Sequence, residues 1–380
     1  MPLIGTPRLF HFELEAPALA DLQARVQSSR LGAVEHLEPW VYGLDATYVS
    51  ALLATWVNGF DWGGWQAAIN RYPHFLANVD GLDLHFRHIR KEGSDRTPLL
   101  LLHGWPGSFL EFDKVIPLLL DAGFDLVIPS LPGMGFSGAA RPMTKERMAR
   151  IVHALMRRVL GYKRFAVHGG DIGSGVATRL GYHDPTSLIG LHLTYLMSEP
   201  PDFAAGATEL EAKYLREIEA WYADEGAYWE IQATKPLTIG YALNDSPVGL
   251  LAWLVDKYRA WSDCGGDVES RFTREELLTV VSLYWFTQTI TSSMSLYFDN
   301  RRRAPLPPGA RIEVPTAVAL FPNEFKPEGM PPRALAERTF NLVRWRSYQS
   351  GGHFAALEEP SALAADIAEF FSELPTSGAR

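Results

Sequence analysis

Short apolar runs that alternate with helical segments constrain the fold of this chain more than any other feature. We read these runs, which are bounded by Gly and Pro, as the strands Leu82–Ile89, Pro98–Leu102, Phe124–Pro129, Phe165–Val167 and Leu188–Leu193. Between them, Lys145–Leu160 has the spacing of an amphipathic helix, and Ser174–Tyr182 predicts another. Strands that alternate with helices in this way indicate βαβ units, so we predict an α/β fold with a mostly parallel sheet.

A long helical segment interrupts this pattern. After Leu193 the alternation stops, and the chain is mainly helical from Thr208 to about Ile290, with helix starts at Thr208 and Ser246. Sheet character then returns before a closing helix, in the order Thr316–Phe321, Val343–Ser347 and Ser361–Glu373. We therefore expect one α/β domain with a helical insertion over the carboxyl ends of its strands, where ligands bind in open sheets.

The first eighty residues form a separate, mixed region. Helices are predicted at Pro17–Ser29 and Ala46–Asn58, followed by an aromatic segment, Trp62–Phe75, that Pro73 breaks. This composition indicates an arm that packs on a larger body. The predicted division is an arm at residues 1–80, an α/β core at residues 81–196 and 298–380, and a helical cap at residues 197–297.

Composition excludes several classes of protein. With 47% hydrophobic and 21% charged residues the chain should fold fully, and its net charge of −9 disfavours nucleic acid as a partner. The single cysteine, Cys264, rules out an intrachain disulfide, which fits a reducing compartment. Neither a targeting pattern in Met1–Phe10 nor a membrane anchor is visible, so we expect a cytoplasmic protein.

The strongest local signal is the pentapeptide Gly169–Gly173, which lies between a predicted strand and a predicted helix. It matches the G-x-S-x-G nucleophile elbow of α/β hydrolases, with Asp171 in the nucleophile position. The flanking glycines suit a turn too tight for side chains. The alternative is that Asp171 only caps the helix that follows, because Asp is a favoured N-cap residue.

A nucleophile at an elbow needs a base and an acid later in the chain. His353, in Gly351–Phe354, follows the last strand-like run and precedes the closing helix, as the order nucleophile, acid, base requires. Glu324 belongs to the segment that follows the preceding strand-like run, Thr316–Phe321. A carboxylate at this place would orient the imidazole and stabilise its cation. Glu328 is the competing acid, and Glu324 is preferred because it lies closer to the strand end.

The segment His103–Gly107 follows the predicted strand Pro98–Leu102 and predicts an oxyanion hole. In this position a loop contributes one backbone N–H, and the residue after the nucleophile contributes the other. We therefore expect the amides of Trp105 and Ile172 to donate. The alternative is a simple His-Gly-Pro turn without a catalytic role.

A carboxylate nucleophile restricts the substrate. It forms an ester with an sp³ carbon, and a water molecule activated by histidine can cleave that ester; an acyl substrate would give a less useful anhydride. Epoxides and alkyl halides are therefore the natural candidates, and this chemistry requires neither a cofactor nor a metal.

Together these motifs resemble the microsomal-type epoxide hydrolases, in particular their soluble bacterial branch. The resemblance runs over nearly the whole chain and is carried by Asn70–Phe75, Gly81–Phe86, His103–Phe109, Gly169–Gly173, Ile231–Gly249, Thr291–Tyr297 and Gly351–Pro360. It implies an α/β-hydrolase fold with a mostly parallel central sheet, an N-terminal arm and a helical cap inserted after the sixth strand.

The resemblance also implies roles for single residues. The nucleophile of the family falls on Asp171, its acid on Glu324 and its base on His353. Two tyrosines that hold and protonate the epoxide oxygen fall on Tyr228 and Tyr297. Ring opening creates an alkoxide, a poor leaving group unless a phenol donates a proton to it, so this pair favours an epoxide over a halide.

One departure from the family concerns the residue after the nucleophile, where this chain has Ile172 and family members often have Trp. The backbone donor is kept, but the apolar wall differs. A dehalogenase would use the same Asp and His with an indole beside the nucleophile, and a binding protein on a dead scaffold would usually have lost part of the triad. We expect an apolar or aromatic epoxide as the substrate, and the oligomeric state, a homo-oligomer included, stays open.

Overall fold

Nine strands of the described residues form one mostly parallel sheet. The computed structural model describes residues 5–32, 36–92, 96–139, 141–196, 208–301, 306–307, 309–324 and 331–375. The strands are β1 (Arg8–Phe10), β2 (His74–Val79), β3 (Leu82–Ile89), β4 (Thr97–Leu102), β5 (Phe124–Pro129), β6 (Phe165–Gly169), β7 (Leu188–Leu193), β8 (Ile312–Leu320) and β9 (Phe340–Ser347). Their order is β1-β2-β3-β5-β4-β6-β7-β8-β9. The strands from β5 to β9 in this order pair in parallel, and β1, β2 and β3 pair antiparallel.

The predicted strands β3 to β9 are confirmed, whereas β1 and β2 were missed. β5 and β7 are buried at every position, because helices cover both faces of the sheet. β1 has only three residues, too few for an alternating pattern. β2 and β3 are joined by Asp80 and Gly81, both with positive φ, in the tight connection typical of a hairpin.

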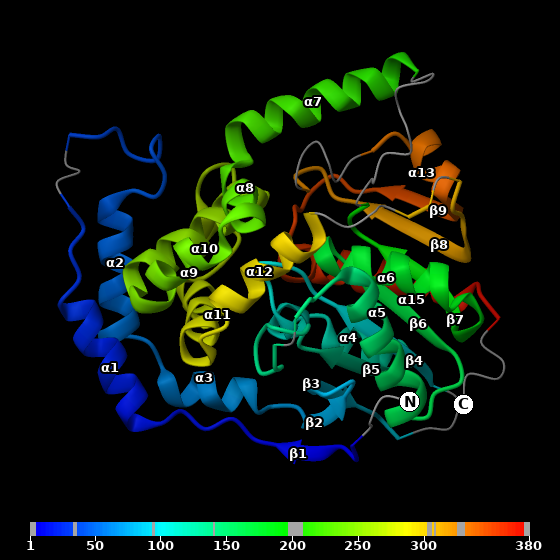
Figure 1. The fold of residues 1–380 in the computed structure, drawn as a ribbon, viewed down its shortest axis with the longest axis horizontal. Helices are drawn as coiled ribbons and strands as arrows, with labels where there is room; N and C mark the ends of the chain where they lie inside the picture. The colour runs from blue at the N-terminus through cyan, green and yellow to red at the C-terminus, as the bar shows by residue number, and fades with distance from the viewer. Residues whose placement is uncertain are drawn as a thin grey trace.

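Two helical layers enclose the sheet (Figure 1). The layer helices are α4 (Ile116–Asp121), α5 (Lys145–Ala154), α6 (Asp171–His183) and α15 (Pro360–Ser372). A Cβ on Gly190 of β7 would meet Phe370 of α15, while Leu191 lies against Gly181 of α6. Successive strand residues point to opposite faces, so α15 and α6 cover different sides of the sheet. Leu155–Val159 continues α5 as one π-helical turn, and helix α6 begins three residues earlier than predicted.

The predicted helical insertion lies between β7 and β8. Within the described residues it contains α7 (Glu209–Glu225), α8 (Ala227–Thr234), α9 (Pro236–Asp245), α10 (Pro247–Trp261), α11 (Arg274–Thr287) and α12 (Ile290–Arg301). It follows the seventh strand among the described residues, whereas the resemblance implied an insertion after the sixth. The predicted boundary between residues 297 and 298 falls inside α12. The Tyr284 hydroxyl of α11 donates to the Gly107 carbonyl 3.1 Å away, so the insertion reaches the loop after β4.

The N-terminal segment packs on both the sheet and the helical insertion (Figure 1). Its helices are α1 (Ala16–Gln27), α2 (Ala46–Asn58) and α3 (Trp62–Ile69), and α2 lies against α10 and α11. The indole N–H of Trp56 on α2 donates to the Ser282 hydroxyl of α11 at 2.8 Å, and both side chains are buried. No helix in the described parts of the chain is both long enough and apolar enough to cross a membrane.

Candidate active site

The elbow between β6 and α6 places Asp171 at the carboxyl end of the sheet. Asp171 is the first residue of α6 and has φ +46°, a left-handed conformation that non-glycine residues rarely adopt. A Cβ on Gly169 would lie 2.6 Å from the Gly173 carbonyl, and one on Gly173 would lie 2.1 Å from the Leu102 carbonyl oxygen. Both flanking positions therefore require glycine, which is the physical basis of the sequence motif.

The loop after β4 holds the carboxylate of Asp171. The backbone N–H of Trp105 donates to Asp171 Oδ1 at 2.8 Å, and a Cβ on Gly104 would lie 2.2 Å from the same oxygen. Ile172 follows Asp171 in the first turn of α6, where backbone N–H groups lack an acceptor within the helix. The structure thus shows the Trp105 amide bonded to the Asp171 carboxylate. It places the Ile172 amide beside Asp171, in the first turn of α6.

The loops after β8 and β9 bring the predicted base and acid together. His353 Nδ1 lies 2.6 Å from Glu324 Oε1, and the two side chains are 5% and 1% exposed. The His353 amide donates to the Trp261 carbonyl at 2.9 Å, and a Cβ on Gly352 would lie 2.7 Å from that oxygen. Gly351 has φ +99°. The two glycines therefore allow the base loop to pass close to the end of α10.

The charges around His353 favour its protonated form. Burial lowers the pKa of His353, but the charge and hydrogen bond of Glu324, with further contributions from Asp171 and Glu111, raise it to about 9. The imidazole is therefore cationic at neutral pH. Glu328, the competing acid, lies outside the described residues.

The helical insertion brings both predicted tyrosines to the same place. Tyr228 on α8 stacks on the Trp105 ring with centroids 5.6 Å apart, and Tyr297 on α12 meets that ring edge-on at 5.9 Å. The two tyrosine rings lie 6.2 Å from each other. Because the amide of Trp105 donates to the Asp171 carboxylate, both phenols lie close to Asp171, although they are more than 55 residues from it in sequence.

Electrostatics distinguish the two phenols. Burial, and then the charge of Asp171, raises the pKa of Tyr297 well above its usual value. Lys257 Nζ lies 5.2 Å from the ring centroid of Tyr228, and its side chain is only 9% exposed. A buried ammonium beside an aromatic face is attracted to the ring, so it stabilises added negative charge on the phenol. Sequence reasoning did not single out Lys257. Its spacing along the helix is also that of a lysine whose aliphatic chain only packs on the core.

Known proteins resemble this chain over nearly its whole length. An "epoxide hydrolase N terminus" family model matches residues 7–112, and an "alpha/beta hydrolase fold" model matches residues 97–288. Epoxide hydrolase 1 of Sus scrofa is 35% identical over 406 residues, which cover 97% of this chain and 89% of the relative. The chain belongs to the epoxide hydrolase family. Among solved structures, the juvenile hormone epoxide hydrolase of Bombyx mori has a TM-score of 0.88 at 30% identity, covering 97% of this chain and 95% of its own. The epoxide hydrolase of Aspergillus niger has a TM-score of 0.83 at 31% identity and covers 97% of each chain.

In this member of the epoxide hydrolase family, Asp263 connects the insertion to the two loops of the acid and the base. Asp263 follows α10; its carboxylate accepts the amide of Gly351 at 2.9 Å and the side-chain amide of Asn323. Arg271 lies 2.5 Å from the same carboxylate. Asn323 precedes Glu324, so one side chain contacts both loops. Sequence reasoning missed Asp263 because these partners lie 60 and 88 residues away.

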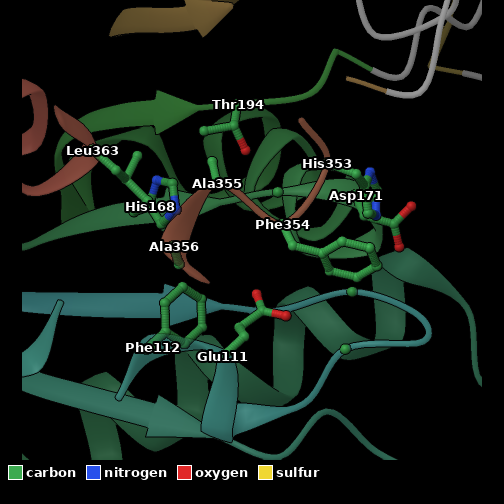
Figure 2. A pocket seen from close by; sticks show the side chains of 13 residues that line it. Glu111, Phe112, His168, Asp171, Thr194, His353, Phe354, Ala355, Ala356 and Leu363 are labelled. Atoms are coloured by element: carbon green, nitrogen blue, oxygen red, sulfur yellow. The ribbon is translucent and has the colours of Figure 1, made fainter. Parts of the chain in front are cut away.

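Glu111 is the second residue of this epoxide hydrolase family member that sequence reasoning missed. It belongs to the 3₁₀ turn Phe109–Phe112 after the oxyanion loop, and it borders a small cavity together with Asp171 and His353 (Figure 2). A Ser three residues before a Glu is the pattern of a capping box, which gives Glu111 a sufficient structural explanation in the sequence.

No group of three or more His, Cys, Asp or Glu side chains in the described ranges could hold a metal ion.

Proposed function

We propose that this chain converts an epoxide to a vicinal diol through a covalent ester on Asp171. The observation that carries the proposal is the place of the Asp171 carboxylate, hydrogen bonded to the Trp105 amide in a site walled by two buried tyrosines. A carboxylate esterifies an sp³ carbon, and phenols supply the proton that an opening epoxide needs. The relatives named above are all epoxide hydrolases, which supports the same reaction.

In the first step an oxygen of Asp171 attacks one epoxide carbon, and the C–O bond of the ring breaks. The ring oxygen leaves as an alkoxide and takes a proton from Tyr228 or Tyr297. The charge of Asp171 raises the pKa of Tyr297 in the resting site, after the larger effect of burial. Ester formation removes that charge as the alkoxide develops, so the phenol becomes more acidic when its proton is needed.

The same loss of charge prepares His353 for the second step. Asp171 is one of the groups that raise the pKa of His353, so its esterification lowers that pKa. His353 can then return a proton to the tyrosinate and become the neutral base. The proton count closes without a proton from outside, because alkylation consumes one and hydrolysis supplies one.

In the second step neutral His353 takes a proton from water, and the resulting hydroxide attacks the ester carbonyl carbon. The amides of Trp105 and Ile172 stabilise the oxyanion of the tetrahedral intermediate. Its collapse releases the diol, whose leaving oxygen takes the proton from His353. The new carboxylic acid of Asp171 then passes its proton to His353, which restores the ion pair with Glu324.

We infer that residues 1–80 serve as an arm, residues 81–196 and 298–380 as the hydrolase core, and residues 197–297 as a lid. The lid supplies Tyr228 and Tyr297, and the Trp56–Ser282 hydrogen bond ties the arm to it. Aromatic rings beside the nucleophile favour an apolar or aromatic epoxide. A cytoplasmic location is a proposal that rests on the sequence, and the oligomeric state stays open.

A single turnover in ¹⁸O-water tests the covalent step. With enzyme in excess, the first-turnover diol takes its new oxygen from Asp171, so we expect unlabelled diol and a labelled peptide that contains Asp171. Mass spectrometry of both products measures this. Acid-catalysed hydrolysis of the same epoxide in ¹⁸O-water serves as the control, because it labels the diol at once. Labelled first-turnover diol with an unlabelled peptide would mean that water attacks the epoxide directly.

A further inference from the structure

A cavity of about 20 Å³ lies beside the nucleophile, on the side of the 3₁₀ turn that contains Glu111. This is room for about one water molecule, which needs two to four polar partners. Its polar side chains include Glu111, Asp171, Thr194 and His353. Figure 2 shows Glu111 entering this space from below, with Thr194 above it and with Asp171 and His353 to the upper right.

Glu111 is held in place by the same loop that holds the nucleophile. The Ser108 amide hydrogen bonds to its carboxyl group, and the Ser108 hydroxyl accepts the Leu110 amide at 3.2 Å. A Cβ on Gly107 would lie 2.1 Å from Glu111 Oε2. Gly104 and Gly107 lie three residues apart in one loop. Gly107 leaves room for the carboxyl group of Glu111, and Gly104 leaves room for that of Asp171. The capping bond needs one carboxyl oxygen, and the other remains available to the cavity.

The environment of Glu111 favours its neutral, protonated form at neutral pH. Burial raises the pKa of Glu111 to about 8, with His353 lowering it and Asp171 raising it. A neutral carboxyl group accepts a hydrogen bond through its carbonyl oxygen but does not compete with histidine for a proton.

We propose that Glu111 is the positioning residue for the hydrolytic water, which occupies this cavity between Glu111 and His353. The proposal rests on the proposed function, because it concerns the second step only. The Glu111 carbonyl oxygen accepts one hydrogen of the water, and His353 takes the other as a proton. The lone pair is thereby directed at the ester carbonyl of Asp171, and the hydroxide forms the new C–O bond there.

Three variants separate positioning from structural support. Glu111→Met keeps the length of the side chain but removes the acceptor, Glu111→Gln keeps both an acceptor and the capping bond, and Ser108→Ala weakens the same turn without changing the carboxyl group. Rapid quench with intact-mass analysis gives the rates of ester formation and ester hydrolysis separately. If Glu111→Met does not fold, Glu111→Leu takes its place.

For Glu111→Met we expect ester formation within about threefold of the wild type and ester hydrolysis slower by about 10²-fold, the scale of a misplaced reactant. The ester then accumulates during turnover. Glu111→Gln and Ser108→Ala should keep the wild-type ratio of the two rates. The proposal is overturned by wild-type hydrolysis in Glu111→Met, by equal slowing of both steps, or by a Glu111→Gln or Ser108→Ala protein that stalls like Glu111→Met. A His353→Gln variant that forms no ester would instead reject the proposed function.

Discussion

At the scale of single residues, the site depends on charges that change during the reaction. Burial has the largest effect on the pKa of both Tyr297 and His353, raising that of Tyr297 and lowering that of His353, and the charge of Asp171 raises both. Neutralising one carboxylate therefore alters the acid and the base together. This coupling explains how a histidine with a pKa of about 9 can still serve as a base near neutral pH.

The paired tyrosines give a prediction at this scale. Tyr228→Phe and Tyr297→Phe should each slow ester formation, and the double variant should slow it by about 10²–10⁴-fold, the usual contribution of a proton donor. Ester hydrolysis should change less, since the phenols enter it only by taking back the proton of His353. Single-turnover rates with the epoxide measure both effects.

Tyr284→Phe is the matched control for the tyrosine pair. Tyr284 is buried and donates to the Gly107 carbonyl, but it is not assigned to the epoxide oxygen. Its loss should affect stability more than the rate of ester formation. If the double variant alkylated as fast as the wild type, the two tyrosines would be packing residues only.

At the scale of elements, the ends of helices and strands position the proposed triad more than their interiors do. Asp171 begins α6, Glu324 and His353 follow β8 and β9, and the Trp261 carbonyl at the end of α10 accepts the amide of His353. Asp263, just after α10, contacts both of those loops. The insertion therefore supports the base and the acid as well as supplying the tyrosines.

Removal of this contact gives the element-scale prediction. Asp263→Ala leaves the Gly351 amide and the Asn323 side chain without their acceptor, which should lower the free energy of unfolding by about 1–3 kcal/mol. Ester hydrolysis should slow more than ester formation, because His353 and Glu324 act in the second step. Urea unfolding and rapid quench measure the two effects.

Asp267→Ala is the control, since Asp267 lies in the same segment of the insertion and its carboxylate caps only the short turn that follows. It should leave both chemical rates near those of the wild type. Equal effects of the two substitutions on ester hydrolysis would show that Asp263 has no special part in holding the loops.

At the scale of the whole molecule, three regions distant in sequence pack against one another. The arm contributes β1 and β2 to the sheet and packs α2 on α10 and α11. The Trp56–Ser282 hydrogen bond, which spans 226 residues, is buried at the junction of arm and insertion. The arm thus stabilises the insertion from the side opposite the core loops.

A single substitution tests this connection. Ser282→Ala leaves the buried indole N–H of Trp56 without a partner, which should cost about 1–3 kcal/mol of unfolding free energy. Ser50→Ala is the control, because Ser50 on α2 is exposed and donates only to its own helix. Denaturant unfolding of the two variants measures the difference. A similar, small effect of both would mean that the junction does not depend on this bond.

The sequence by itself determined the parts of this protein that short-range patterns encode. Apolar runs predicted β3 to β9, helix starts at Thr208 and Ser246 were correct, and the elbow glycines marked Asp171, because a tight turn excludes side chains locally. The order of motifs indicated Glu324 and His353, and the structure brings them within 2.6 Å.

The tertiary structure alone decided what depends on distant partners. β1 forms because it pairs with the edge strand β2. Its three residues are too few to show an alternation of apolar and polar side chains in the sequence. Sequence reasoning singled out neither Glu111 nor Asp263; packing places Glu111 at the cavity beside Asp171 and Asp263 between two loops. The physical reason is that burial and neighbouring charge give a carboxyl group its role, and both are properties of the folded chain.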